Sequence, residues 1–142
     1  MIILLLISQN VYCQNDFLLE SYERPIISVN VNGKTLYMLI DTGSSLNVLD
    51  IDVLDKIGVE KRFRMNQVVT LGTTHDIWHI RKVDIQVKDR AVNQFISSDI
   101  TVIRESILQA TGIKITGILG TPAIRELGMI IDLKRGIITL KD

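Results

Sequence analysis

The group in this sequence best suited to chemistry is an aspartate that interrupts an apolar segment. Residues 38–49 read MLIDTGSSLNVL, so Asp41 follows three apolar residues and precedes the small residues Thr42, Gly43 and Ser44. Burying an ionised carboxylate costs free energy, so a chain that places one in its core needs a reason to do so. A desolvated carboxylate is a reagent for general acid–base chemistry, and Asp41 is therefore the first candidate catalytic residue.

The segments around Asp41 are predicted to be strands that deliver it to a loop. Residues 27–31 alternate apolar and polar side chains, and Asn32-Gly33 is a dipeptide preferred in two-residue hairpin turns. Residues 35–40 then return as a second strand that ends at Asp41. The apolar pattern resumes after the loop, so the aspartate is expected between two core strands.

The rest of the chain is predicted to be rich in strands, with a few short helices. Helices are expected over 50–58 and 103–111, and after Thr121-Pro122, where a threonine N-cap would precede a proline. Strands are expected over 67–71, 77–87, parts of 92–102, 117–120, 129–133 and 137–140. This order predicts a β-barrel or sandwich with two or three short helices.

Length and composition exclude several classes of function. The 142 residues suit one domain, and 16 Lys and Arg balance 16 Asp and Glu without a basic cluster, so nucleic-acid binding has no support. Cys13 is the only cysteine, which leaves no disulfide framework and no thiolate metal site. His75 and His79 lack an evident third ligand, so they are expected to be solvated loop residues, and neither a metal nor a cofactor is predicted.

The first thirteen residues, MIILLLISQNVYC, are expected to be a signal peptide. Their apolar run, residues 2–7, is too short to span a bilayer as a helix. This predicts a secreted or periplasmic protein without a stable membrane span, in which residues 14–142 form a single domain. The alternative is that the N-terminal segment forms a buried strand.

Two motifs resemble those of a known enzyme family. Residues 39–44, LIDTGS, are similar to the apolar-apolar-Asp-Thr-Gly-Ser signature of aspartic proteases, and Ile118-Leu119-Gly120 resembles their second, apolar-apolar-Gly element. Their order and the closing hairpin resemble the retropepsin-like branch in its single-domain, bacterial-type form, over residues 25–140. The resemblance implies the closed β-barrel of the acid protease fold.

The same resemblance assigns roles around Asp41, which would be the catalytic residue. Gly43 would let the backbone and the substrate approach, and its N–H can donate to the carboxylate. Thr42 would brace two such loops against each other, and Ser44 would bond the catalytic carboxylate. These three residues therefore support the catalytic loop.

The polar connection at residues 72–76 corresponds in this resemblance to the family's flap, a hairpin that closes over an extended peptide. The substrate-binding tip is assigned to Gly72, Thr73 and Thr74. Trp78 is expected to pack in the core or in the flap.

Hydrolysis of a peptide bond by this route needs two carboxylates that share one proton. No second Asp-Thr-Gly or Asp-Ser-Gly occurs in the sequence, so the second carboxylate must come from another copy of the chain. The prediction is a homodimeric aspartic endopeptidase that acts on extended peptides or proteins.

Two other functions stay open. One is a non-catalytic retropepsin-fold module that binds peptides or assists assembly, and the other is a structural β-domain in which residues 41–44 form an ordinary turn. Dimerisation would exclude the turn, and activity that is lost in Asp41→Asn would exclude the non-catalytic module.

Overall fold

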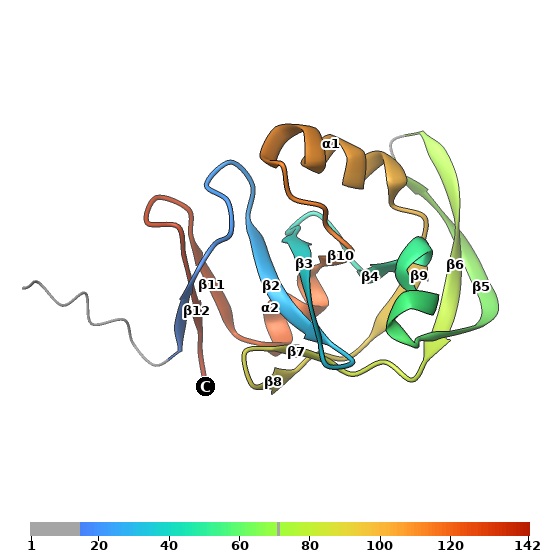
Figure 1. Cartoon of the computed structure of the whole chain (residues 1–142), viewed down its shortest axis with the longest axis horizontal. Helices are drawn as coiled ribbons and strands as arrows, with labels where there is room; N and C mark the ends of the chain where they lie inside the picture. The colour runs from blue at the N-terminus through green and yellow to red at the C-terminus, as the bar shows by residue number, and fades with distance from the viewer. Residues whose placement is uncertain (1–14, 71) are drawn as a thin grey trace, which may run out of the picture.

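The computed structural model describes residues 15–70 and 72–142 (Figure 1). The strands are β1 (Asp16–Leu18), β2 (Ile26–Val31), β3 (Lys34–Ile40), β4 (Asn47–Asp50), β5 (Glu60–Thr70), β6 (Thr73–Arg81), β7 (Ile85–Val87), β8 (Arg90–Ala91), β9 (Phe95–Ser98), β10 (Gly117–Leu119), β11 (Met129–Asp132) and β12 (Ile137–Leu140). The helices are two 3-10 turns, η1 (Ile51–Val53) and η2 (Asp55–Ile57), and two α-helices, α1 (Thr101–Thr111) and α2 (Thr121–Glu126). The predicted mainly β fold with short helices is confirmed. The predicted signal peptide, residues 1–13, lies outside the described residues.

Most strands belong to one large sheet whose order is β5-β6-β9-β4-β10-β3-β2-β7-β8, and β1-β12-β11 form a second, small sheet. Figure 1 shows the small sheet at one end of the molecule and the β5–β6 hairpin at the other, with α1 above the strands between them. The ladder order of the large sheet ends at β5 and at β8. In residues 15–70 and 72–142 no ladder joins these two edges, so the expected barrel closure does not come from hydrogen bonds between them.

The β2–β3 hairpin forms where the sequence predicts it. Its turn residues Asn32 and Gly33 both have positive φ, 49° and 82°, which is the conformation that the Asn-Gly dipeptide adopts most readily. The central feature of the sheet lies at the other end of β3, where β10 inserts between β3 and β4. It pairs parallel with β3 and antiparallel with β4, so the two predicted motifs lie side by side.

Two apolar clusters hold this arrangement. The larger one joins the hairpins, η2, α2 and the small sheet. The smaller one packs α1 onto the centre of the sheet through Ile100 and Ile107, which contact a cluster that includes Val48, Ile115 and Ile118. Helix α1 ends at Gly112 in the left-handed conformation, as predicted. None of the helices within the described residues is long and apolar enough to cross a bilayer.

Two predicted boundaries are wrong. Residues 73–76 are not a polar connection but the start of β6, because Thr73 and Thr74 pair with Thr70 and Val69 across a tighter turn. The predicted strand 77–87 is divided between β6 and β7.

The start of α2 also differs from the prediction by one residue. Gly120 is the N-cap and Thr121 is already helical, because the Thr121 hydroxyl donates to the carbonyl of Ser44 at 3.2 Å instead of capping the helix.

Candidate active site

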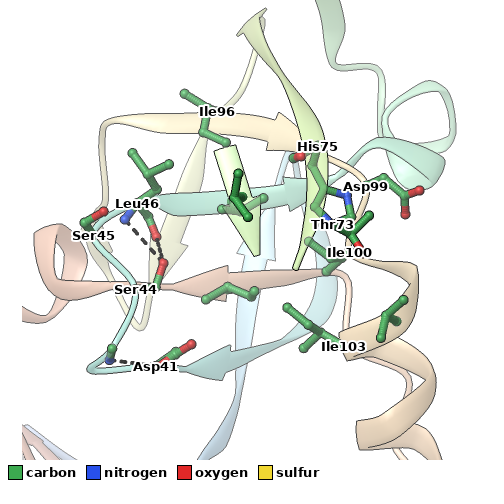
Figure 2. Close-up of a pocket in the computed structure, with 16 residues that line it drawn as sticks. Asp41, Ser44, Ser45, Leu46, Thr73, His75, Ile96, Asp99, Ile100 and Ile103 are labelled. Carbon is green, nitrogen blue, oxygen red and sulfur yellow. Dashed lines mark hydrogen bonds between the residues drawn. The ribbon is translucent and has the colours of Figure 1, made fainter. Parts of the chain in front are cut away.

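Asp41 follows the last residue of β3 and is fixed by two backbone hydrogen bonds. Its own N–H donates to the carbonyl of Leu119 at 2.9 Å, which ties it to the second motif. The N–H of Gly43 donates to Asp41 Oδ1 at 2.8 Å (Figure 2). The carboxylate is half-buried, and the position of Oδ1 is thus set by the loop that follows it.

Glycine at position 43 leaves room for this contact. A Cβ atom there would lie 3.2 Å from Asp41 Oδ1, which is tighter than an ordinary van der Waals contact, so a larger residue would have to displace the carboxylate slightly. The role implied for Gly43 is consistent with this geometry. Thr42 is exposed.

Ser44 departs from the role implied by the family resemblance. Its hydroxyl donates to the carbonyl of Leu46 at 2.8 Å and accepts from the N–H of Leu46 at 3.3 Å. Ser44 is joined to Asp41 through the backbone instead, since its N–H donates to the Asp41 carbonyl at 3.2 Å. Ser44 closes the catalytic loop on itself, because a serine hydroxyl readily bonds backbone groups two residues away.

The second motif clamps this loop through Gly120. A Cβ atom on Gly120 would lie 2.3 Å from the carbonyl oxygen of Leu46 and 2.7 Å from that of Ser44, so only glycine lets the two segments approach this closely. The N–H of Thr121 adds a hydrogen bond to the carbonyl of Ser44 at 2.8 Å. Ile118 and Leu119 pair with Leu39 and Ile40, directly before Asp41, and Gly120 lies against the loop that follows it.

Asn47 is a site residue that the sequence did not single out. It is 0% exposed, and its side chain bonds both the second motif and the segment before β9. Its signal is an isolated amide within an otherwise apolar run, residues 46–49, because a buried amide needs partners for its donors and acceptor.

A cavity of about 470 Å³ opens beside Asp41. Its floor and walls come from the catalytic loop, β6, β9 and the start of α1 (Figure 2). The lining combines aliphatic side chains with nearly as many polar ones; it consists of Asp41, Gly43, Ser44, Ser45, Leu46, Val48, Val69, Thr73, His75, Ile96, Ser98, Asp99, Ile100, Val102, Ile103 and Ile118. Such a mixture suits a ligand that has apolar groups to bury and polar groups to orient it.

The three predicted flap residues lie at or next to the tip of the β5–β6 hairpin. Gly72 has a φ of +77° in the turn, and Thr73 lines the cavity, whereas Thr74 is exposed and does not. Trp78 is half-buried in β6 with Lys61 Nζ 4.2 Å from its ring centre, so it packs within this hairpin.

The prediction that the two histidines are solvated loop residues is wrong, because β6 extends over both positions. His75 is half-buried in the cavity wall, and His79 stacks on Phe63 with ring centres 4.9 Å apart. In the part of the chain that the structure describes, no group of three His, Cys, Asp or Glu side chains is arranged to hold a metal ion.

The charged groups near the cavity are held by specific partners. The N–H of Thr101 donates to Asp99 Oδ1 at 2.8 Å, and this hydrogen bond holds the pKa of Asp99 below its ordinary value. Asp50 caps η1 and also forms a buried ion pair with Arg104 of α1. Burial is the largest single effect on Arg104 and opposes its charge, but the hydrogen bonds and charges of Asp50, Asp52 and Glu105 together outweigh burial and raise the pKa of Arg104.

Comparisons with known proteins agree with this geometry. A family model described as aspartyl protease matches residues 27–123, a span that includes both motifs and the β5–β6 hairpin. A comparison with curated proteins gave no match.

Solved structures show a similar fold. The chain resembles the EIAV protease complexed with the inhibitor HBY-793 with a TM-score of 0.56 and 22% identity, over 79% of this chain and 93% of that one. It resembles the retroviral protease-like domain of Ddi1 from Leishmania major with a TM-score of 0.58 and 15% identity, over 82% and 87%. A retropepsin-like aspartic protease from Rickettsia conorii gives 0.58 and 14%, over 88% and 87%. The chain therefore belongs to the aspartyl protease family and has the retropepsin-like fold.

Proposed function

We propose that this protein is an aspartic endopeptidase in which two chains each contribute Asp41. The observation that carries the proposal is a half-buried carboxylate that lines a cavity of mixed aliphatic and polar character, fixed by the Gly43 N–H in a loop that packs against the second motif. A carboxylate that is fixed and partly desolvated beside a ligand-sized cavity is suited to acid–base catalysis.

The proposed reaction uses one proton shared between the two aspartates. The ionised carboxylate takes a proton from a water molecule, whose oxygen bonds to the carbonyl carbon of the substrate. The protonated carboxyl donates to the developing oxyanion. When the C–N bond breaks, the nitrogen leaves with a proton returned from the dyad, and the products are a carboxylic acid and an amine.

The need for a second chain is supported by the charges around the cavity. Asp99 is the other carboxylate that lines it, and Figure 2 shows Asp99 across the cavity from Asp41. The Thr101 N–H holds the pKa of Asp99 below its ordinary value, which disfavours the protonated form that a dyad partner must adopt. Asp41 of a second chain is the carboxylate that completes the dyad.

The exposed position of Thr42 also supports a two-chain site. Thr42 is exposed, so a second loop could contact it.

Among the described residues, β12 is flanked on both sides by β1 and β11, so any pairing of the small sheet with a second chain would use the outer edges of β1 or β11.

The substrate is proposed to be an extended peptide. It would lie between the catalytic loop and the β5–β6 hairpin, where Thr73 of the hairpin and Ser44 of the loop both line the cavity. Extended peptides add to such clefts through backbone hydrogen bonds, and alternate side chains enter pockets.

The test is cleavage of a library of unstructured peptides from about pH 3 to 7, because a carboxylate dyad works while one proton is shared. The wild-type chain is expected to cleave, and Asp41→Asn is expected to lose at least about 1,000-fold in kcat. The matched control is Asp84→Asn, which should cleave normally because Asp84 is an exposed aspartate between β6 and β7 whose N–H bonds Asn32 in the β2–β3 turn, away from Asp41. A folded wild-type dimer that cleaves nothing would replace this proposal with a non-catalytic peptide-binding or assembly module.

A further inference from the structure

Asn47, the first residue of β4, makes three hydrogen bonds to backbone groups, two at the start of α2 and one in the segment before β9. Its Oδ1 accepts from the N–H of Gly120 at 3.0 Å and from the N–H of Ala123 at 3.2 Å. Its Nδ2 donates to the carbonyl of Asn93 at 3.0 Å. The side chain is wholly buried, so these partners replace water for every group involved.

Only a side chain with both an acceptor and a donor can satisfy this set. The start of α2 leaves N–H groups without helical partners, and Thr121, which is the usual kind of residue to cap them, bonds Ser44 instead. Asn47 supplies the missing acceptor from a different strand. Its amide then holds the Asn93 carbonyl, which leucine could not do and an ionised aspartate would repel.

The fixed point that Asn47 creates lies against the catalytic loop. Gly120 touches the carbonyls of Ser44 and Leu46, and the preceding residue, Leu119, accepts the N–H of Asp41. A shift of Gly120 would therefore move the loop on one side and the Asp41 backbone on the other. Asn47 itself does not line the cavity and touches no reacting atom.

We propose that Asn47 is a positioning residue that sets the placement of the Asp41 carboxylate by holding Gly120 against the catalytic loop. The expected effect of Asn47 on kcat rests on the proposed function. The placement of Gly120 and Asp41 can also be measured without an activity assay.

Aspartate at position 47 tests the proposal because, when protonated, it again offers both the hydrogen-bond donor and the acceptor that the asparagine amide provides. A protonated carboxyl offers one acceptor and one O–H donor, as the amide does, whereas the ionised form lacks the donor. We expect kcat of Asn47→Asp, per folded protein, to approach the wild-type value near about pH 3 and to fall by more than about tenfold by pH 6. Asn47→Leu can neither donate nor accept a hydrogen bond, so it should lose about 100-fold in kcat at every pH with KM nearly unchanged.

Asn32 offers a matched control. It also makes three hydrogen bonds to backbone groups, with Ile57, Lys82 and Asp84, but it lies at the other end of β3 from Asp41. Asn32→Asp should lose stability without changing the pH profile of kcat. If Asn47→Asp has the same pH profile as the wild type and Asn32→Asp, the proposal is overturned, even where Asn47→Leu fails to fold.

Amide hydrogen exchange separates this proposal from the proposed function. At pH 6 the N–H groups of Gly120 and Asp41 should exchange at least about tenfold faster in Asn47→Asp than in Asn32→Asp, since their protection depends on the local arrangement. This result would support the positioning role even if the wild-type chain cleaved no peptide. Equal exchange rates in the two variants would contradict it.

Discussion

The catalytic loop and the β5–β6 hairpin border the same cavity but are held in different ways. The loop that contains Asp41 is hydrogen-bonded to Leu119 and Thr121 and packs closely against Gly120, residues that lie about eighty positions away in the sequence. The hairpin joins the rest of the sheet through two paired positions between β6 and β9, and residues 61–67 of its outer strand are all exposed.

This difference separates the two jobs that a peptide-cleaving site must do. A catalytic carboxylate works only when its position is set to a fraction of an ångström, whereas a segment that covers a substrate must open and close. Few buried contacts lower the free energy needed for local opening. We therefore expect substitutions near the loop to change stability and chemistry, and matched substitutions in the hairpin to have small effects.

The largest difference in stability is expected between two ion pairs. The ion pair between Arg104 of α1 and Asp50 at the end of β4 has side chains that are 10% and 2% exposed. In the ion pair at the base of the hairpin, the side chains of Lys82 and Glu60 are 63% and 43% exposed. Arg104→Met leaves Asp50 buried without a partner and should lower the free energy of unfolding by about 3 kcal/mol. Lys82→Met should leave it unchanged, because exposed pairs contribute little. Urea denaturation of both variants measures this, and equal losses would contradict the comparison.

A second contrast uses the same substitution in both regions. Gly120→Ala would place a Cβ against two carbonyl oxygens and should cost about 2 kcal/mol or more and reduce kcat, because backbone must move. In Gly72→Ala, the new Cβ atom in the hairpin turn would meet no atom within 4 Å. The only expected cost is the strain of an alanine at a φ of +77°, which should lower the free energy of unfolding by about 1 kcal/mol. Thermal unfolding and kcat measurements on both variants test whether Gly120→Ala causes the larger losses. A larger loss of kcat in Gly72→Ala would reverse the assignment of rigid and adaptable regions.

The smallest predicted effect concerns Asp99, where α1 meets the cavity. Because the pKa of Asp99 is below its ordinary value of 3.8 in the folded state, its contribution to stability is present above that pH and is lost as the pH falls through the folded pKa. Asp99→Ala should thus lower the free energy of unfolding by less than about 1 kcal/mol at pH 6 and by nothing measurable at about pH 2. A loss that is larger at pH 2 than at pH 6 would contradict this account.

The parts of the site that the sequence predicts are those encoded by neighbouring residues. The Asn32-Gly33 turn and the strand before Asp41 are local patterns, and both form as expected. The family resemblance identifies Gly120 as part of a second motif, but its close approach to Leu46 is seen only in the structure, because residues this far apart do not reveal their contact by spacing. Asn47 and the Arg104–Asp50 pair were missed for the same reason.

The hairpin was predicted less well because its strands lack a clear alternation of apolar and polar residues. Thr73, Thr74 and His75 read as a polar connection, but pairing with β5 extends the strand over them. The cross-strand partner overrides the local preference, as is common in sheets.

The most direct test of the two-chain site is to mix the wild-type chain with Asp41→Asn chains under conditions that allow exchange of subunits. If each active site needs Asp41 from both chains, a tenfold excess of the variant should reduce the activity of a fixed amount of wild type to about one tenth, because most wild-type chains then pair with a variant. Unchanged activity, with exchange verified by a labelled chain, would contradict a site shared between two chains.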